Sequence, residues 1–409
     1  MLELLRTALN GKFKRMWHVH DLKDSYEVVI IGGGAHGLAT AHYLARDHGI
    51  TDVAVLEKGY LGSGGSGRNT AIVRSNYLTP DGISFYDESL KLYEQLALEL
   101  GFNVMFSQRG HLTLAHSDAA VRTMRWRAEV NQIQGVNSRL IWPDEIAELC
   151  PTLDLSEHPR YPILAALYHP PGGIVRHDAV VWGYARGADQ RGVHLHQQTE
   201  VTDIDVQAGS VVGVQTDRGY IRTGTVINAA AGWCTLISDM AGVRLPVTTH
   251  PLQACVTEAL KPFLNVVVVS GSLHVYVSQS DRGELVMGSA IDPYQSYSMD
   301  STLGFLESIS SHMLQLFPGL ANVRILRQWA GICDMTPDYS PIMGLTPVDG
   351  FLVDVGWGTY GFKATPVSGK RMAELIATGE TPPVLQPFRL SRFEEMDLVG
   401  EKGAAAVGH

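Results

Sequence analysis

The chain has 409 residues, of which 45% are hydrophobic and 18% charged, and its formal net charge is -10. This length exceeds one ordinary core of roughly 100 to 200 residues, so we expect two domains. The acidic balance argues against nucleic acid or an anionic membrane surface as a partner, and no apolar run reaches the roughly 18 residues that a membrane span needs. The composition predicts a soluble globular protein.

The cysteines and the amino end bear on the cellular compartment. Cys150, Cys234, Cys255 and Cys333 are widely spaced, a pattern that predicts neither a metal site nor a disulfide framework and fits a reducing cytoplasm. Residues 1–25 contain leucines near helical spacing but lack the continuous apolar segment and the cleavage site of a signal peptide. Two interpretations of this extension stay open, a frayed tail or an arm that lies on a partner subunit.

The strongest motif follows the apolar run Val28–Ile31, where a Gly-x-Gly-x-x-Gly pattern leads into a helical sequence. Gly32 allows the tight turn, Gly34 lets the backbone approach a pyrophosphate, and Gly37 lets the helix and the strand pack closely. The helix N-terminus also offers free N–H groups to an anion. This stretch therefore predicts a dinucleotide-binding site.

Later segments extend the same predicted site. A second strand over residues 53–56 ends in Glu57, about twenty residues after the last fingerprint glycine, where a carboxylate can accept a hydrogen bond from a ribose hydroxyl. The glycine-rich loop 62–70 is interpreted as a second side of the phosphate site rather than as a flexible linker. A strand over residues 225–228 ends in small residues against which a cofactor can lie, and a glycine loop near residue 358 leads into the last helix.

The order of these segments predicts an α/β fold, α+β overall, in which the dinucleotide-binding domain is discontinuous in sequence. Its three parts are expected at residues 26–105, 164–235 and 326–395. Residues 106–163 and 236–325 carry several long strands and predict a substrate domain with a large mixed β-sheet. Residues 396–409 are expected to form a C-terminal tail.

The ordered motifs resemble the FAD enzymes of the D-amino-acid oxidase and sarcosine oxidase class. Within that class, residues 26–409 look like the beta subunits of heterotetrameric sarcosine oxidases. The segments that carry this narrower resemblance are Arg68–Thr70, Arg74–Tyr77, Phe106–Gly110, Arg160–Pro162, Gly173–Ile174, His177–Asp178, His250–Gln253, His274–Gln279, Gly283–Gly288, Trp357–Thr359 and Gly403–His409. The His177 region and the tail are the most specific of them.

The resemblance implies a Rossmann-like domain that binds FAD without a covalent bond. In the monomeric sarcosine oxidases a cysteine tethers FAD, and its place falls on Gly331 here, so Cys333 is not expected to be the link. The residues that we expect to bind FAD are Gly32, Gly34, Ala35, His36, Gly37, Glu57, Lys58, Ser66, Arg68, Asn69, Thr70, Val201, Ala230, Gly232, Gly358, Gly361, Phe362 and Lys363.

Three residues are candidates for catalysis. Arg74 and Lys363 could together hold one substrate carboxylate, because a guanidinium offers two parallel hydrogen bonds and a lysine adds a point charge. The resemblance assigns both positions to the site that fixes the carboxylate of sarcosine. His274 is the third candidate, since it and Tyr276 are predicted on one face of a strand and either could line the cavity. His36 is expected to face solvent from the first helix turn.

His177 is the candidate for a covalent flavin link. Asp178 is a predicted N-cap, and the positive end of a helix disfavours the imidazolium form of the histidine that precedes it. A neutral imidazole can add to a flavin methyl group. The resemblance implies a covalent FMN at this position, at the interface with the alpha subunit.

The resemblance implies oxidation of a small N-methyl amino acid, with sarcosine as the best single candidate. The products would be glycine and formaldehyde or methylene-folate, with electrons passing from FAD to the covalent FMN. Alpha, gamma and delta subunits are the implied partners. Two alternatives stay open: a dehydrogenase subunit for N-methylglutamate or another N-methyl amino acid, and a flavin electron-relay subunit whose own cavity is inert.

Overall fold

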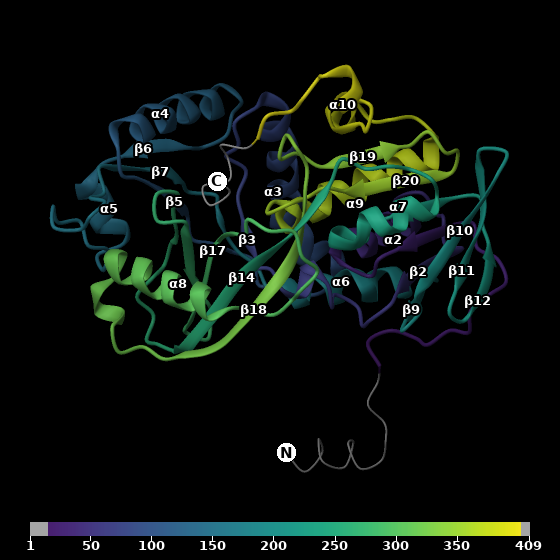
Figure 1. Ribbon diagram of the computed structural model, residues 1–409, viewed down its shortest axis with the longest axis horizontal. Helices are drawn as coiled ribbons and strands as arrows, with labels where there is room; N and C mark the ends of the chain where they lie inside the picture. Colours follow the sequence, from purple (N-terminus) through teal and green to yellow (C-terminus); the bar gives the residue numbers. More distant parts are fainter. Residues whose placement is uncertain (1–14, 402–409) are drawn as a thin grey trace, which may run out of the picture.

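The computed structural model describes residues 15–401, in which two large sheets lie toward opposite ends of the molecule (Figure 1). The six-stranded sheet has the order β19-β20-β13-β1-β2-β9, and the eight-stranded sheet has the order β18-β14-β17-β16-β15-β5-β7-β6. Strands of the first are β1 (Val28–Ile31), β2 (Val53–Glu57), β9 (His194–Gln197), β13 (Val226–Asn228), β19 (Ile342–Leu345) and β20 (Phe351–Val355). The predicted α/β fold with a large mixed sheet is confirmed.

The six-stranded sheet is parallel except for β19, which pairs antiparallel with β20. Strand β1, near the middle of this sheet, is buried on both faces. Val28 and Ile30 pack into one apolar cluster, and Val29 and Ile31 pack into another. Alternate side chains of a strand point to opposite faces, which explains why a continuous apolar run was needed here. Helices α2 (Ala35–Asp47), α3 (Pro80–Leu100), α6 (His177–Asp189) and α9 (Gly361–Thr378) share the first cluster.

The other face of this sheet is covered by an antiparallel meander and a short helix. The meander consists of β10 (Val201–Gln207), β11 (Ser210–Thr216) and β12 (Gly219–Arg222), and the helix is α7 (Cys234–Met240). The sequence predicted this meander from its alternating pattern. Because layers cover both faces of this sheet, a ligand can reach it only at the ends of its strands.

The eight-stranded sheet contains β5 (His111–Ala115), β6 (Arg139–Ile141), β7 (Ala165–His169), β14 (Thr248–Ala259), β15 (Val267–Ser270), β16 (Val275–Gln279), β17 (Glu284–Ile291) and β18 (Ile325–Met335). One face packs into a core with α5 (Pro143–Leu149) and α8 (Leu303–Leu316), and α4 (Asp118–Ile133) lies against β5, β6 and β7. Leu112 and Leu114 of β5 enter that core. The side chains of His111 and Thr113, which alternate with these leucines, therefore point to the opposite face.

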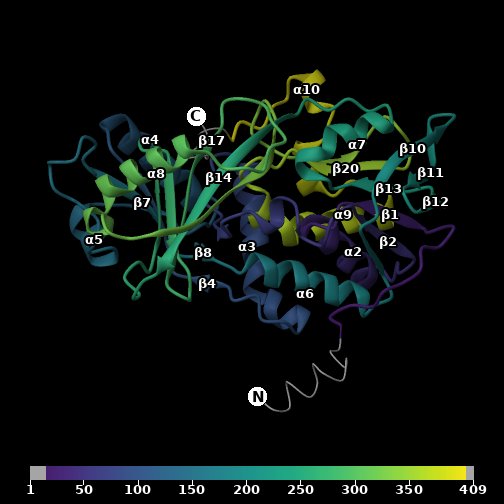
Figure 2. The same ribbon diagram turned by 60° about the horizontal axis from the view of Figure 1, so that its bottom comes forward.

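A small sheet of β3 (Ile72–Val73), β8 (Gly173–Ile174) and β4 (Ser107–Gln108) lies between the two large ones. Ile72 and Ile174 pack against Val267, Val269 and Tyr276 of the eight-stranded sheet. The chain between Val73 and α3 thus runs along the face of that sheet. In Figure 2 the short strands β4 and β8 lie to the left of α6.

The remaining elements are the short helix α10 (Arg392–Glu395) and the 3₁₀ turns Gly65–Gly67, Ala231–Trp233, Pro318–Leu320 and Pro383–Phe388. Within residues 15–401, no helix is both long and apolar enough to cross a lipid bilayer.

Two details differ from the sequence predictions. Strands β7 and β18 lie in segments assigned to the dinucleotide-binding domain, but both hydrogen-bond into the eight-stranded sheet; the division into domains itself stays a prediction. Helix α6 begins at His177 with Arg176 as its N-cap, so Asp178 is not the cap. The Asp178 carboxylate instead forms a two-point ion pair with the Arg176 guanidinium, at 2.7 and 3.0 Å.

The described part of the N-terminal extension contacts this chain. The Asp189 carboxylate at the end of α6 accepts a 2.9 Å bond from the main-chain N–H of His18 and lies 2.9 Å from its Nδ1. His20 stacks on His194 with ring centroids 3.9 Å apart. His18, His20 and Asp189 bring donor atoms within 4.8 Å of one another, and we interpret the group as the anchor of this segment. Most of the predicted extension and most of the predicted tail lie outside the described residues.

Candidate active site

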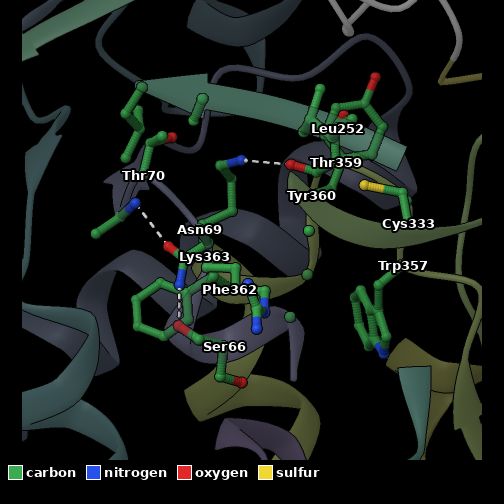
Figure 3. Close-up of a pocket in the computed structure, with 18 of the residues that line it drawn as sticks. Ser66, Asn69, Thr70, Leu252, Cys333, Trp357, Thr359, Tyr360, Phe362 and Lys363 are labelled. Atoms are coloured by element: carbon green, nitrogen blue, oxygen red, sulfur yellow. Dashed lines mark hydrogen bonds between the residues drawn. The ribbon is translucent and has the colours of Figure 1, made fainter. Parts of the chain in front are cut away.

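A cavity of about 200 Å³ lies where the carboxyl ends of β1, β13 and β20 meet the free face of the eight-stranded sheet (Figure 3). Its lining comes from the fingerprint helix, the glycine-rich loop with β3, the strands β5, β14, β15, β16 and β18, the turn at Ala231, and the loop before α9 with the first turn of that helix. The lining residues include His36, Ser66, Arg68, Asn69, Thr70, Arg74, His111, Thr113, Tyr276, Gly331, Cys333, Asp334, Trp357, Gly358, Gly361, Phe362 and Lys363.

The fingerprint has the geometry that the sequence predicts. Gly32 has φ +115°, and a Cβ there would lie 2.4 Å from the carbonyl oxygen of Ala229. A Cβ on Gly37 would lie 2.1 Å from the carbonyl oxygen of Gly32. Gly34 is the N-cap of α2 and contributes no side-chain cap to the helix N–H groups. These close contacts require glycine and leave a helix N-terminus open to an anion.

Glu57 and Ser66 both lie against the fingerprint turn. One oxygen of the Glu57 carboxylate accepts from Gly33 N at 2.9 Å, and the other accepts from Gly59 N at 2.7 Å. The Ser66 hydroxyl accepts from Ala35 N at 2.9 Å. Because a carboxylate oxygen can accept more than one hydrogen bond, Glu57 retains capacity for a ribose hydroxyl.

Besides Gly65 and Ser66, the glycine-rich loop contributes Arg68, Asn69 and Thr70 to the cavity lining. Arg68 is held from both sides, since its Nη1 donates to the Ala330 carbonyl at 3.4 Å and its own carbonyl accepts from Trp329 at 2.8 Å. Asn69 accepts from Ala71 N at 2.6 Å, and Thr70 lines the cavity beside it. These bonds fix the loop against β18.

Four further predicted cofactor residues lie outside this lining. Ala230 precedes the turn that contains Gly232, where a Cβ would lie 2.4 Å from the Ile332 side chain. The Lys58 ammonium lies 4.5 Å from the ring centroid of Trp233. Val201 is buried at the start of β10 in the cluster behind β2. Their contribution to cofactor binding stays a prediction.

Arg74 is buried and lines the cavity. Its Nη1 donates to the Asn76 carbonyl at 2.8 Å and to the Asn76 side-chain oxygen at 3.1 Å, and its guanidinium lies over the Tyr77 ring at 4.5 Å. Arg127 also donates to the Asn76 carbonyl, and burial together with the charge of Arg74 lowers the pKa of Arg127 to about 9. The sequence analysis missed Arg127, because nothing in the α4 pattern marks its arginine as buried.

Lys363 lines the same cavity from the first turn of α9. Its Nζ donates to the Thr359 carbonyl at 3.3 Å, a bond drawn in Figure 3. None of the ion pairs formed within residues 15–401 includes Lys363. Burial, and then the charge of Arg74, lower the pKa of Lys363 to about 7. The two predicted cations therefore meet in one cavity.

The prediction for the orientation of His36 is wrong. Its Nδ1 lies 3.3 Å from the Asp354 carboxylate and 3.0 Å from the Ser368 hydroxyl, and its Nε2 lies 2.9 Å from the Gly361 carbonyl. Burial opposes the charge on this imidazole, but Asp354, the Gly361 carbonyl and the charge of Asp334 together outweigh it, and the pKa of His36 is raised. The helix α9 packs directly on α2, and this contact, invisible in the sequence, covers the face that was expected to be solvated.

The prediction for His274 is also wrong in its geometry. Strand β16 begins at Val275, and His274 lies in the preceding turn with φ 49°, so the alternation that paired it with Tyr276 does not apply. Tyr276 lines the cavity and His274 does not. His111 and Asp334 line it and were not predicted. Asp334 accepts from Gly356 N at 2.6 Å, and burial raises its pKa to about 6.

A second cavity, of about 310 Å³, adjoins the first and contains His177. The two share Arg68, Asn69, Thr70 and Ala71 in their linings. Burial lowers the pKa of His177; the charge of Asp178 opposes this shift and the charge of Arg176 adds to it, so the net effect favours a neutral ring. The sequence prediction of a neutral ring rested instead on the positive end of the helix. The arginines in this lining are Arg68, Arg176, Arg282 and Arg327.

Comparison with known proteins decides the family. Residues 27–375 match the family described as FAD dependent oxidoreductase (DAO). The chain belongs to this family. Within the DAO family it is 47% identical over 407 residues to sarcosine oxidase subunit beta of Rhizobium meliloti (strain 1021), covering 99% of this chain and 98% of that one. It is 46% identical to the protein of the same name from an Arthrobacter species, covering 96% of this chain and 97% of the relative.

Solved structures of other enzymes share the fold. L-proline dehydrogenase from P. horikoshii aligns with a TM-score of 0.87 and 32% identity, over 92% of this chain and 100% of that one. Glycine oxidase from Bacillus cereus ATCC 14579 aligns with a TM-score of 0.79 and 25% identity, over 90% of this chain and 99% of that one. The chain is a flavin-dependent oxidoreductase with FAD as its cofactor, and the predicted Rossmann-like FAD-binding fold is confirmed.

The residues present fit FAD. The open N-terminus of α2 suits the pyrophosphate, and Glu57 at the end of β2 suits a ribose hydroxyl. The cavity lining continues from Asn69 and Thr70 to Lys363, so the cavity lies beside the loops that are predicted to bind FAD.

Proposed function

We propose that this chain oxidises a small N-methyl amino acid, with sarcosine as the first candidate. One observation carries the proposal: Arg74 and Lys363, two buried cations from distant parts of the chain, line one cavity next to the FAD-binding loops. A carboxylate bound between them would meet a guanidinium that can donate two parallel hydrogen bonds and an ammonium that adds a point charge. Its amine would then lie toward the cofactor.

The printed names of the relatives support the amine class. Two relatives that this chain matches over nearly its full length are sarcosine oxidase beta subunits, and the similar structures are a proline dehydrogenase and a glycine oxidase. Sarcosine, proline and glycine each carry an amine next to a carboxylate. The two-cation cavity fits the element that these substrates share.

Within this proposal the residues of the chain bind and orient. Arg74 presents its guanidinium to the carboxylate, and Lys363 adds a second charge, so the substrate is held in one direction. FAD supplies the ring that accepts a hydride equivalent from the C–H bond next to nitrogen. A protonated Lys363 beside bound FAD would also stabilise electron density that develops on the cofactor.

We further propose a covalent FMN on His177 and an assembly with alpha, gamma and delta subunits. The neutral, partly buried imidazole and the arginines of the second cavity suit a flavin ring and its phosphate. The relatives' names identify them as subunits. Leu98, Trp126 and Ile133 on α3 and α4 are exposed, and such apolar side chains suit a partner contact. All four cysteines are free thiols, which supports a cytoplasmic location.

The test is a substrate profile on the assembled protein. Sarcosine, N-methylglutamate, glycine and L-proline would be compared by kcat/KM and by bleaching of the flavin absorbance without oxygen. The proposal predicts the highest kcat/KM for sarcosine. Rapid turnover of N-methylglutamate with none of sarcosine would favour the dehydrogenase alternative. No flavin bleaching with any amine, together with activity that persists in Arg74→Ala and Lys363→Ala, would favour the electron-relay alternative.

A further inference from the structure

Two histidines lie side by side under the substrate cavity. His111 of β5 and His169 of β7 are directly opposite each other in the antiparallel register. Side chains at opposed positions share one face of a sheet, and this is the face that lines the cavity. Gly172 packs tightly against both, since a Cβ there would lie 2.7 Å from the Cβ of His111 and 3.2 Å from the His169 ring.

The hydrogen bonds of His169 are complete. Its Nδ1 donates to the Asn137 carbonyl at 2.7 Å, and its Nε2 accepts from Ser75 N at 3.2 Å. These two bonds fix the tautomer and attach β7 to the residue that follows Arg74. His169 thus holds the Arg74 segment in place and has no nitrogen to offer a ligand.

His111 is different. Its side chain is buried and lines the cavity, whereas His169 does not line it. Within residues 15–401, the His111 Nδ1 has no hydrogen-bond partner. A buried polar nitrogen without a partner costs free energy unless a ligand or an ordered water satisfies it.

The groups that act on His111 are almost all cationic. Burial lowers its pKa well below the usual value, and Arg74, His169, Arg127 and Lys363 lower it further. The ring is therefore neutral and next to the same positive charges that are proposed to attract the substrate carboxylate. It can donate one hydrogen bond to that carboxylate without adding to the repulsion among the cations.

We propose that His111 is a third anchor for the acid end of the substrate, donating a hydrogen bond to the carboxylate held between Arg74 and Lys363. This inference rests on the proposed function and deepens it. It assigns the amine end of the substrate to the opposite side of the cavity, away from β5.

The experiment compares two ligands on the assembled protein. Sarcosine has both a carboxylate and an amine, whereas (methylthio)acetate keeps the carboxylate and replaces nitrogen with sulfur. The KM for sarcosine and the Kd for (methylthio)acetate, read from the flavin spectrum, would be measured for wild type, His111→Leu and His111→Asn. His48→Leu, at an exposed helix end, is the control. Flavin content and Tm would be recorded for each.

His111→Leu should weaken both ligands by the same factor, about 10-fold to 100-fold for a lost bond to a charged group, with kcat changed much less. His111→Asn, which keeps a polar group near the position of Nδ1, should recover part of the affinity. Weakening of sarcosine alone would put His111 at the amine end and overturn the proposal. Unchanged affinities, or equal losses in both variants with lowered Tm, would overturn it as well. A wild type that binds (methylthio)acetate but does not oxidise sarcosine would refute the proposed function while the His111 comparison remained valid.

Discussion

Arg74 and Lys363 line one cavity, although one follows β3 and the other lies in the first turn of α9. Burial and the charge of Arg74 lower the pKa of Lys363 to about 7. The charge on Lys363 therefore depends on Arg74 and on what lies between the two side chains.

Removing either cation should impair substrate binding severely. Arg74→Ala and Lys363→Met are each expected to lower kcat/KM by about 30-fold to 4,000-fold, because truncating one member of a buried charge contact costs about 2 to 5 kcal/mol. Steady-state kinetics with sarcosine would measure this. Lys261→Met, which removes an exposed lysine, is the control and should stay within twofold of wild type. Wild-type kinetics in both cavity variants would contradict the assignment.

Carboxylate binding should depend on pH through Lys363. In the empty site its pKa is about 7, so the lysine loses its charge as the pH rises through that value. A bound carboxylate favours the charged form and raises the pKa of the lysine. Affinity should therefore be greatest below pH ~7 and should fall above it, by at most tenfold per pH unit. Titration with (methylthio)acetate at several pH values would show this, and Lys363→Met should bind weakly without the break near neutral pH.

The covalent flavin depends on His177. The assembled wild type should retain yellow fluorescence on this polypeptide after denaturation in acid, and His177→Asn should retain none, because an amide cannot replace the imidazole as a nucleophile. Mass spectrometry of the denatured chain would confirm the added mass. His158→Asn, an exposed histidine elsewhere, should leave the label unchanged. Flavin bound to His177→Asn would identify another residue as the link.

The fingerprint should not tolerate a methyl group at Gly37. A Cβ there would lie 2.1 Å from the carbonyl oxygen of Gly32, so strand β1 and helix α2 must separate. Gly37→Ala should lower Tm and release FAD, with a cost of about 1 to 3 kcal/mol from overpacking. Gly304→Ala in α8 is the matched control, since a Cβ there meets nothing within 4 Å. Equal FAD content in the two variants would contradict this prediction.

Local patterns were enough wherever one segment determines its own geometry. The run from Val28 to Ile31 predicted a strand buried on both faces, and the three fingerprint glycines predicted the turn that follows, because steric limits on the backbone act over a few residues. The alternating pattern of residues 201–222 likewise predicted the meander. These are short-range constraints, and they can be read in order along the chain.

Predictions failed where a distant element covers a residue. His36 was expected in solvent and is instead held by Asp354 and the start of α9. The His274 prediction failed for a local reason, since β16 begins one residue later and His274 has a left-handed φ. Arg127 and His111 were missed since their burial arises from contacts between elements far apart in the sequence. Only the packing of α9, β5 and the Arg74 segment brings these side chains to one site.

The sequence by itself determined the fold class and the dinucleotide fingerprint, because each depends on residue type and local spacing, and its family resemblance marked Arg74 and Lys363 as candidates. Tertiary structure alone decided that Arg74, Lys363 and His111 line one cavity, and that a second cavity with His177 adjoins it. The physical reason is that charge, burial and hydrogen-bond capacity at a site are set by what packs around it, and those neighbours come from strands and helices that the linear sequence separates.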